Sequence, residues 1–294
     1  MTDKMKETTI SNSELSIKVK AHGAELSSII YNGKEYLWQA DPAFWSRHSP
    51  VLFPIVGAVW DGIYKVEGEE YSLSQHGFAR DMEFGLLSAA DNEIWYRLCS
   101  NDDSKKKYPY DFQLNIGYKL EGRKIHVMWE VHNPSESNMY FQIGAHPAFY
   151  LSGEEKDGNK GFFGFDNTDN LQITLIKKKG CADTSKHYNA ELNADRLMPI
   201  TADTFTKDAL IFENHQLKDV TLYDSMKNPY LNVSFDAPLV GLWAPKPTSP
   251  FVCIEPWYGR CDSANYNGEF KDKEWIQTLS AKETFKGGYT IEIL

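Results

Sequence analysis

The chain has 294 residues, 41% hydrophobic and 24% charged, which is the balance of a folded protein rather than of a disordered chain. Acidic residues outnumber basic ones by 41 to 31, and the net charge of −10 disfavours nucleic acid, whose phosphates attract positively charged proteins. The most apolar stretch, 50–60, is too short to span a membrane, and 1–9 lacks the apolar region of a secretory signal. We therefore expect a cytoplasmic protein without a membrane partner.

Apolar and polar residues alternate along most of the chain, the period-two pattern of strands with one buried face. The pattern begins at 15–19, and the clearest hairpin joins 114–120 to 125–131 across a turn at 121–123. Asn32-Gly33 and Glu67-Gly68 supply the turn residues that tight hairpins need. Further alternating runs are 64–73, 94–99, 171–176, 220–223, 231–235 and 289–293. This spacing predicts an all-β fold of two packed antiparallel sheets, a large β-sandwich.

Few segments interrupt this pattern. A short helix is expected within 274–285, and the polar stretches 154–161 and 177–189 are expected to be loops. No linker or internal repeat divides the chain, so 1–294 is predicted to be a single domain.

The cysteines are four in number and scattered. Cys99, Cys181, Cys253 and Cys261 show no C-x-x-C spacing, so neither a zinc site nor a disulfide framework is predicted. We interpret them as core thiols.

Two segments in the first third of the chain place basic groups beside Gly or Pro. In 45–57, Arg47 and His48 precede an apolar, proline-punctuated run that we expect near a pocket wall. In 75–81, His76 and Arg80 follow an alternating strand, and the guanidinium of Arg80 can hold hydroxyls, a carboxylate or a phosphate. The competing interpretation is structural: Arg47 would be a solvated charge, Arg80 would pair with Asp81, and His76 would be a hydrogen-bonded histidine.

Two later segments carry the groups best suited to proton transfer. His146 precedes Pro147, which favours an extended backbone and fixes the direction of the ring, and histidine can give and take protons near neutral pH. Glu255 ends an apolar strand directly before Pro256, and a buried carboxylate is costly unless it is paired or has a task. The alternatives are that His146 is a buried structural histidine and that Glu255 belongs to a structural ion pair.

These four segments, together with Gly23-Ala24-Glu25-Leu26 and Tyr36-Leu37-Trp38, resemble the galactose mutarotase-like superfamily. Within it, the sequence is similar to the LacX-like branch of the aldose 1-epimerase family, and the matching motifs run through nearly the whole chain. The resemblance implies a large antiparallel sandwich, called a supersandwich, with a sugar lying across a concave sheet.

The resemblance also implies roles for individual residues. His146 would be the general acid at the ring oxygen and Glu255 the general base at the anomeric hydroxyl. His76 and Arg80 match an H-G-F-A-R stretch that contacts the sugar, and Arg47 is close to another sugar-binding arginine. Asp208 resembles an acidic residue that binds sugar hydroxyls. The better-known galactose mutarotases have an asparagine-rich form in place of H-G-F-A-R, so a preference for galactose does not carry over.

The chemistry of mutarotation agrees with these residues. It needs one proton removed from the C1 hydroxyl and one delivered to O5, so it requires no cofactor, no metal and no phosphate-binding loop. Trp243 and Trp257 offer flat apolar surfaces for a sugar, although both are equally expected to pack in the core. The expected partner is a small-molecule sugar or sugar phosphate, and the sequence does not settle which. Arg47, Arg80 and Lys246 suit a phosphate and neutral sugar hydroxyls equally. The sequence carries no prediction of oligomeric state.

Three other functions compete with an epimerase. A glycoside hydrolase or lyase normally needs two carboxylates, and Asp208 is the only such partner for Glu255. A non-catalytic carbohydrate-binding protein would use the same residues for hydrogen bonds alone. A histidine metal site would draw on residues that lack ligand spacing, namely His22, His48, His76 and His146.

Overall fold

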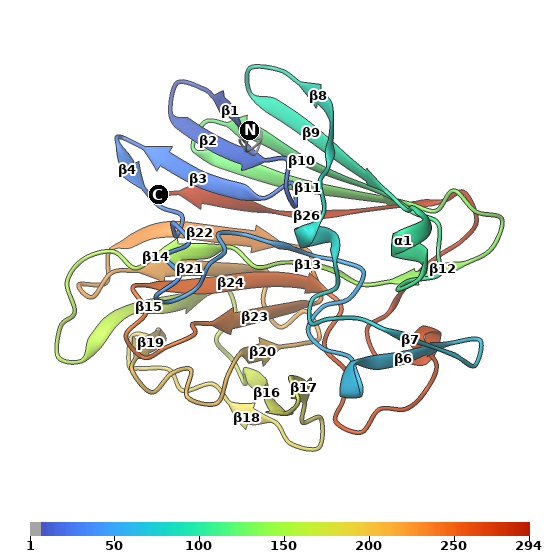
Figure 1. The fold of residues 1–294 in the computed structure, drawn as a ribbon. Helices are drawn as coiled ribbons and strands as arrows, with labels where there is room; N and C mark the ends of the chain where they lie inside the picture. Colours follow the sequence, from blue (N-terminus) through green and yellow to red (C-terminus); the bar gives the residue numbers. More distant parts are fainter. Residues whose placement is uncertain (1–6) are drawn as a thin grey trace.

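The computed structural model describes residues 7–294, and Figure 1 shows a nearly all-β molecule. The first six residues, part of the stretch used to predict the absence of a secretory signal, lie outside the described residues. Strands are antiparallel in both of the large sheets. The predicted all-β sandwich is therefore confirmed.

Over the described residues, the first large sheet has nine strands. In spatial order they are β19 (Met198–Thr201), β15 (Asn159–Phe165), β21 (Asp219–Tyr223), β22 (Pro229–Phe235), β26 (Thr284–Ile293), β11 (Lys124–His132), β10 (Gln113–Glu121), β9 (Glu93–Cys99) and β8 (Gly85–Ala89).

The second large sheet also has nine strands among residues 7–294. Seven follow one path: β17 (Cys181–Ala182), β16 (Gln172–Lys178), β20 (Leu210–Phe212), β23 (Leu239–Trp243), β24 (Phe251–Tyr258), β13 (Ile143–Ala145) and β5 (Val51–Leu52). Off this path, β14 (Ala148–Tyr150) pairs with β24 and β18 (Tyr188–Asn189) pairs with β16.

Smaller elements complete the described chain. Its N-terminal part forms a four-stranded sheet of β1 (Glu7–Ser11), β2 (Leu15–Lys20), β3 (Leu26–Tyr31) and β4 (Lys34–Glu35). Two-stranded pairs are β6 (Ile63–Val66) with β7 (Glu69–Ser72), and β12 (Met139–Phe141) with β25 (Gln277–Leu279). The helical turns are α1 (Asp102–Lys105), η1 (Trp60–Gly62), η2 (Ala79–Asp81) and η3 (Phe270–Asp272).

The local predictions are mostly confirmed. In the central hairpin Leu114 faces Val131 and Leu120 faces Ile125, so the two predicted apolar faces coincide. The tight turns at Asn32-Gly33 and Glu67-Gly68 have positive φ at both residues.

Four local predictions were wrong in whole or in part. The helix expected within 274–285 is absent, because Gln277–Leu279 pairs as β25 with β12 and β26 begins at Thr284. The expected loop 177–189 contains β17 and β18, which pair with β16, and the loop 154–161 ends where β15 begins. Strand pairing thus overrides weak local patterns, whether the partner is distant in sequence, as for β25, or close, as for β17 and β18. Cys99 is exposed rather than buried, whereas Cys181, Cys253 and Cys261 are buried, and all four are free thiols.

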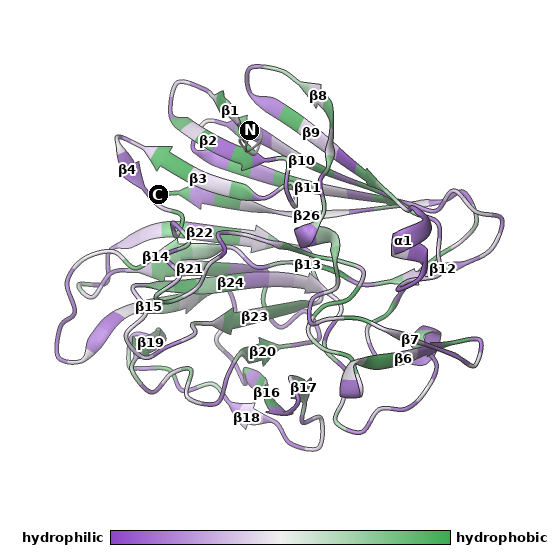
Figure 2. Cartoon of the chain, viewed as in Figure 1, coloured by the Kyte–Doolittle hydropathy of each residue, from purple (hydrophilic) through white to green (hydrophobic). Residues whose placement is uncertain are grey.

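Strand alternation divides the second sheet into a core face and an open face. On β24, Val252 and Ile254 belong to the large buried cluster that also takes in residues of the first sheet, such as Trp129. Cys253 and Trp257 belong to separate small clusters on the other face. Figure 2 shows how hydrophobic β23 and β20 are. Among residues 7–294, no helix has the length and hydropathy needed to cross a membrane.

Candidate active site

A cavity of about 1120 Å³ lies against the open face of the second sheet. This volume lies slightly above the usual range for ligand pockets, about 300–1,000 Å³. The structure brings together all eight residues that the sequence suggested for catalysis or sugar binding. They are Arg47, His76, Arg80, His146, Asp208, Trp243, Glu255 and Trp257.

Strand β24 supplies the floor of the cavity. Glu255 is 1% exposed and lies opposite Gly241 of β23, so no side chain from that neighbour covers it. The indole of Trp257 lies over Gly241 on one side and Gly144 of β13 on the other, and a Cβ at either glycine would clash with it. Trp257 is buried and donates to the carbonyl of Ala145. It therefore shapes the floor by packing in the core while still bordering the cavity.

His146 lies between β13 and β14, on the chain that neighbours β24. Its Nε2 is 3.4 Å from Oε2 of Glu255, and both side chains are buried. Within the described residues, neither Nδ1 of His146 nor Oε2 of Glu255 has a hydrogen-bond partner. Two side chains that can exchange protons thus face each other at the base of an open cavity, and each has one atom without a hydrogen-bond partner among the described residues.

Burial acts in opposite directions on these two groups. Desolvation, and then the negative charge of Asp208, raise the pKa of Glu255 well above its usual value. Desolvation, followed by the positive charges of Arg80 and Arg47, lowers the pKa of His146. At 3.4 Å the two groups are close enough for their titrations to be coupled, and the opposite pKa shifts favour one exchangeable proton on the pair.

Aromatic rings fix the direction of the His146 imidazole. Trp45 stacks on it with the ring centroids 4.7 Å apart and the planes at 26°. Trp243 and His76 each meet it edge-on, at 5.3 Å and 5.5 Å between centroids. Sequence reasoning missed Trp45 as a site residue, although it begins the first polar segment. Trp45 reaches His146 because two segments that are about a hundred residues apart in the sequence pack together.

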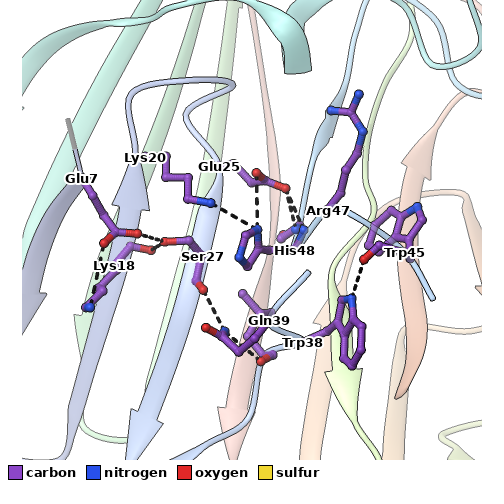
Figure 3. Close-up of polar contacts among 12 residues, drawn as sticks. Glu7, Lys18, Lys20, Glu25, Ser27, Trp38, Gln39, Trp45, Arg47 and His48 are labelled. Carbon is purple, nitrogen blue, oxygen red and sulfur yellow. Dashed lines mark hydrogen bonds and ion pairs between the residues drawn. The ribbon is translucent and has the colours of Figure 1, made fainter. Parts of the chain in front are cut away.

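The segment that carries Trp45 is anchored by buried polar groups, as Figure 3 shows. One oxygen of Glu25 accepts hydrogen bonds from the backbone amides of His48 and Ser49, at 2.9 Å and 3.0 Å. The indole of Trp38 donates to the carbonyl of Trp45 at 2.7 Å. Burial alone would raise the pKa of Glu25, but the hydrogen bonds and charge of His48 lower it overall, so the carboxylate stays ionised. Glu25 belongs to the motif 23–26 and Trp38 to the motif 36–38. These contacts show that both motifs hold the Trp45 segment in place.

Arg47, His76 and Arg80 come from two adjoining segments. Nη2 of Arg47 lies 2.8 Å from Oδ1 of Asp81. The alternative interpretation of Arg47 as a solvated charge is therefore wrong. Arg80 lies within η2 and donates to the carbonyl of Gln75 at 2.7 Å. His76 accepts a hydrogen bond from the amide of Gly57 on Nδ1, so in its neutral form Nε2 carries the hydrogen. Burial, and then the charges of His146, Arg80 and Arg47, lower the pKa of His76, which keeps it neutral.

Asp208 and a group of lysines border the other side of the cavity. Asp208 is exposed, has a left-handed backbone with φ of 71°, and accepts a hydrogen bond from the amide of Ala209. The lysines, which sequence reasoning also missed, are exposed residues of β16, of the turn after it and of the loop before β20: Lys177, Lys178, Lys179 and Lys207.

The four histidines of the alternative metal site are not gathered in one place. His22 pairs with Glu83 and His48 lies beside Glu25, so only His76 and His146 share the cavity. Among residues 7–294, the group that could offer metal ligands is His146, Cys253 and Glu255, whose ligand atoms lie within 4.8 Å of one another.

Comparisons with known proteins relate the whole chain to one family. A family model described as aldose 1-epimerase matches residues 6–260. The chain is 30% identical to the chromosomal protein LacX of Lactococcus lactis subsp. lactis, covering 97% of this chain and 98% of that protein. It is also similar to the crystal structure of a galactose mutarotase related enzyme from Lactobacillus acidophilus, with 31% identity, a TM-score of 0.91, and 98% and 97% of the two chains covered. A galactose mutarotase-like protein from Lactobacillus casei has 27% identity and the same TM-score, over 98% of this chain and 100% of that one.

Proposed function

The chain belongs to the aldose 1-epimerase family, and from this we propose that it interconverts the α and β anomers of an aldose by acid and base catalysis. The observation that carries the proposal is the buried pair of His146 and Glu255, whose facing atoms are 3.4 Å apart on the floor of the cavity. In this proposal Glu255 removes the proton of the C1 hydroxyl while His146 delivers a proton to O5.

The closeness of the pair suits this reaction. The proton donor and the proton acceptor act on two oxygens bonded to the same carbon, so the acid and the base must stand side by side. Ring opening leaves an aldehyde that can rotate about its bond to C2 and close on either face. Reclosure returns the proton from O5 to His146 and the proton from Glu255 to O1. The pair ends the cycle with the protons that it had at the start, and the carbon skeleton is unchanged.

The directions of the two pKa shifts suit proton transfer in both directions, as ring opening and reclosure require. The opposite shifts of Glu255 and His146 favour a neutral acid beside a neutral imidazole, which is the proton distribution of the open-chain intermediate in this scheme. Moving the proton between the two groups changes no net charge in the buried site. Each positioned proton-transfer group is typically worth ~10²–10⁴-fold in rate.

A glycoside hydrolase fits the site less well. Such enzymes normally place two carboxyl groups on either side of the scissile bond, at least about 5 Å apart. Two further carboxylates border this cavity: Asp208 is exposed and accepts a hydrogen bond from its own neighbouring amide, and Asp183 pairs with Lys177. The group facing Glu255 is instead a histidine. The other alternative is a carbohydrate-binding protein without catalysis. It would bind the same sugar, but anomer exchange would stay at the spontaneous rate.

Anomer exchange measured by NMR separates these possibilities. Purified protein is added to equilibrated sugars, and exchange between the α and β signals is compared with the spontaneous rate in the same buffer. We expect catalysed exchange without hydrolysis of glycosides. Sugar binding with exchange at the spontaneous rate would refute the proposal in favour of the binding protein. We further propose a cytoplasmic setting, because buried free thiols such as Cys253 and Cys261 suit a reducing compartment.

A further inference from the structure

We propose that the floor of the cavity is also a Zn²⁺ site, in which His146, Cys253 and Glu255 bind the ion, and that the bound ion inhibits anomer exchange. Each of the three side chains offers one ligand atom, and these atoms lie within 4.8 Å of one another. An imidazole nitrogen, a thiolate sulfur and a carboxylate oxygen are the ligand types that Zn²⁺ takes in proteins. The metal site stands apart from the proposed function, and only the inhibition rests on it.

The spacing of the ligand atoms suits a tetrahedral ion. Nitrogen and oxygen ligands lie about 2.0–2.1 Å from Zn²⁺, so at the tetrahedral angle they stand about 3.3–3.4 Å from each other. Nε2 of His146 and Oε2 of Glu255 are already 3.4 Å apart. Cys253 lies two residues before Glu255 on β24, so both side chains are on the same face of the sheet. Because a sulfur ligand at about 2.3 Å stands about 3.6 Å from the other two, a shift of about 1 Å closes the site.

Burial and charge balance also favour a divalent cation at this place. Glu255 and Cys253 are both buried, and among residues 7–294 Oε2 of Glu255 has no hydrogen-bond partner. A buried carboxylate is stable when it is paired or when it coordinates a metal. A thiol that coordinates a metal loses its proton, so thiolate and carboxylate together carry two negative charges. These cancel the two positive charges of Zn²⁺, and the bound ion adds no net charge to the buried floor.

The surroundings of the three ligands select for Zn²⁺ and let it enter. Mg²⁺ and Ca²⁺ take six or more ligands, nearly all of them oxygen, whereas this group offers a single carboxylate. Cys253 packs in an apolar cluster with Trp38 and Phe251, and such a shell keeps water away from a metal-bound thiolate. His146 and Glu255 border the cavity, which gives the ion an entry path and leaves its fourth position to water.

A bound ion would stop the proposed reaction at both proton-transfer groups. The imidazole of His146 and the carboxylate of Glu255 would give electron pairs to the metal. Neither group could then accept the proton of the C1 hydroxyl or exchange a proton with O5. Anomer exchange should therefore fall with the fraction of protein that carries Zn²⁺.

Metal binding is tested without sugar, on protein treated with EDTA and dialysed. Co²⁺ accepts the same ligands as Zn²⁺, and a cobalt–thiolate bond gives a charge-transfer band in the near-ultraviolet. We expect this band when Co²⁺ is added, its loss when Zn²⁺ displaces the more weakly bound Co²⁺, and no effect of Mg²⁺. Absence of the band at a large excess of Co²⁺ would overturn the proposal.

Variants then identify the thiol. Cys253→Ala should abolish the band and weaken Zn²⁺ binding by about 100-fold or more, because removal of a group that only supports a metal ligand already costs about 10–100-fold. Cys253→Ser, which is closer to cysteine in volume, should lose the band in the same way. The matched control is Cys261→Ala, which removes another buried free thiol at the same cavity and should keep the band. A band that persists in both Cys253 variants, or that Cys261→Ala also loses, would rule out the site.

Inhibition is measured in the NMR exchange assay. At a Zn²⁺ concentration that saturates the unaltered protein, exchange by this protein and by Cys261→Ala should fall by about tenfold or more, and EDTA should restore it. Cys253→Ala should keep its exchange rate at the same Zn²⁺ concentration. Normal exchange by the Zn²⁺-loaded protein would contradict the inhibition. If no sugar is interconverted even without metal, the proposed function and the inhibition both fail, whereas the cobalt band and the Zn²⁺ affinity still decide the metal site.

Discussion

The indole of Trp45 stacks on the imidazole of His146, with their centroids 4.7 Å apart and their planes inclined by 26°. This contact joins the first polar segment of the chain to the proposed acid. On the same ring, Trp243 packs edge-on, so the imidazole is confined on two sides and keeps its Nε2 directed at Glu255. The orientation of the proposed acid is therefore set by aromatic packing rather than by a hydrogen bond to Nδ1 within the described residues.

Trp45→Ala should lower kcat for anomer exchange by about three- to tenfold, because an aromatic pair contributes about 0.5–1.5 kcal/mol and the imidazole would gain freedom. Trp45→Phe should retain most of the rate, since a smaller ring can still stack. Trp95→Ala, which removes an indole from the first sheet, serves as the control. A normal kcat in Trp45→Ala, with its fold verified by circular dichroism, would exclude this positioning role.

Glu25 is expected to act at a distance, by holding the Trp45 segment. Glu25→Ala leaves the buried amides of His48 and Ser49 without their acceptor and should lower the free energy of unfolding by about 2–3 kcal/mol. The same variant should raise KM, whereas Glu25→Gln, which keeps an acceptor oxygen, should restore most of both. Urea unfolding and NMR exchange measure the two effects.

The pH dependence of unfolding gives a further readout for Glu25. Its folded pKa lies below its unfolded value, so its contribution to stability is present above about pH 4.3 and is lost as pH falls through the folded pKa. Glu25→Gln should remove this acid-side loss. Glu7→Gln, a change in β1 at a more exposed carboxylate, is the control. An identical acid-side loss in Glu25→Gln would show that another carboxylate causes it.

The sequence carried enough information to predict the fold class and much of the site. Strand alternation identified the hairpin of β10 and β11 with its register, because a one-residue shift would move every apolar side chain to the wrong face. The eight site residues were predicted from unusual polar groups beside Gly or Pro and from a family resemblance, and all eight border one cavity.

What the sequence missed depends on contacts between distant segments. Strand β25 has only three residues and forms because it pairs with β12, so its local pattern resembled a helix. Trp45 and Lys178 meet the cavity only after the sheets have packed, and nothing in their own segments distinguishes them from core or surface residues. The motif that contains Glu25 was identified, but no role was predicted for Glu25 itself. Its partners His48 and Ser49 lie on another segment of the chain.

Removal of metal ions should leave the activity unchanged, because neither proton transfer needs a Lewis acid. After treatment with EDTA we expect kcat within about twofold of the untreated value, a change below the usual contribution of a catalytic group. Cys253→Ala tests the same point from the protein side, since Cys253 is the third potential ligand beside His146 and Glu255. This variant should lose about 1 kcal/mol of stability, as for a buried methyl-sized group, and keep its activity. Loss of activity in both experiments, with recovery on adding Zn²⁺, would favour a metal mechanism.

The pH profile of kcat should be flat near pH 6.5, where an ordinary histidine titrates. The reaction needs one exchangeable proton on the pair, and the pair holds one between the lowered pKa of His146 and the raised pKa of Glu255. The acid limb should therefore lie below the ordinary pKa of histidine and the alkaline limb above that of glutamate. Asp208→Asn should move the alkaline limb to lower pH, because the charge of Asp208 helps to raise the pKa of Glu255. The exposed neighbour Asp203 provides the control, and an unshifted limb in Asp208→Asn would argue against this coupling.

The sharpest test of the mechanism is Glu255→Gln. The amide keeps the volume and part of the hydrogen bonding of the carboxylate, but it cannot accept the proton of the C1 hydroxyl. We expect exchange to fall by ~10²–10⁴-fold, toward the spontaneous rate, while the fold and much of the sugar affinity remain. Glu130→Gln, the same substitution on the first sheet, should have no such effect.

His146→Asn should cause a loss similar to that of Glu255→Gln, and the double variant should be hardly slower than either single one, because groups that exchange one proton act as a unit. The facing atoms, 3.4 Å apart, make this non-additivity a specific expectation for this pair. Sugar titrations followed by tryptophan fluorescence would verify that each variant still binds, since Trp45 and Trp243 border the cavity. Near-normal exchange by folded Glu255→Gln would mean that Glu255 is not the base. Strictly additive losses in the double variant would mean that the two residues act in separate steps.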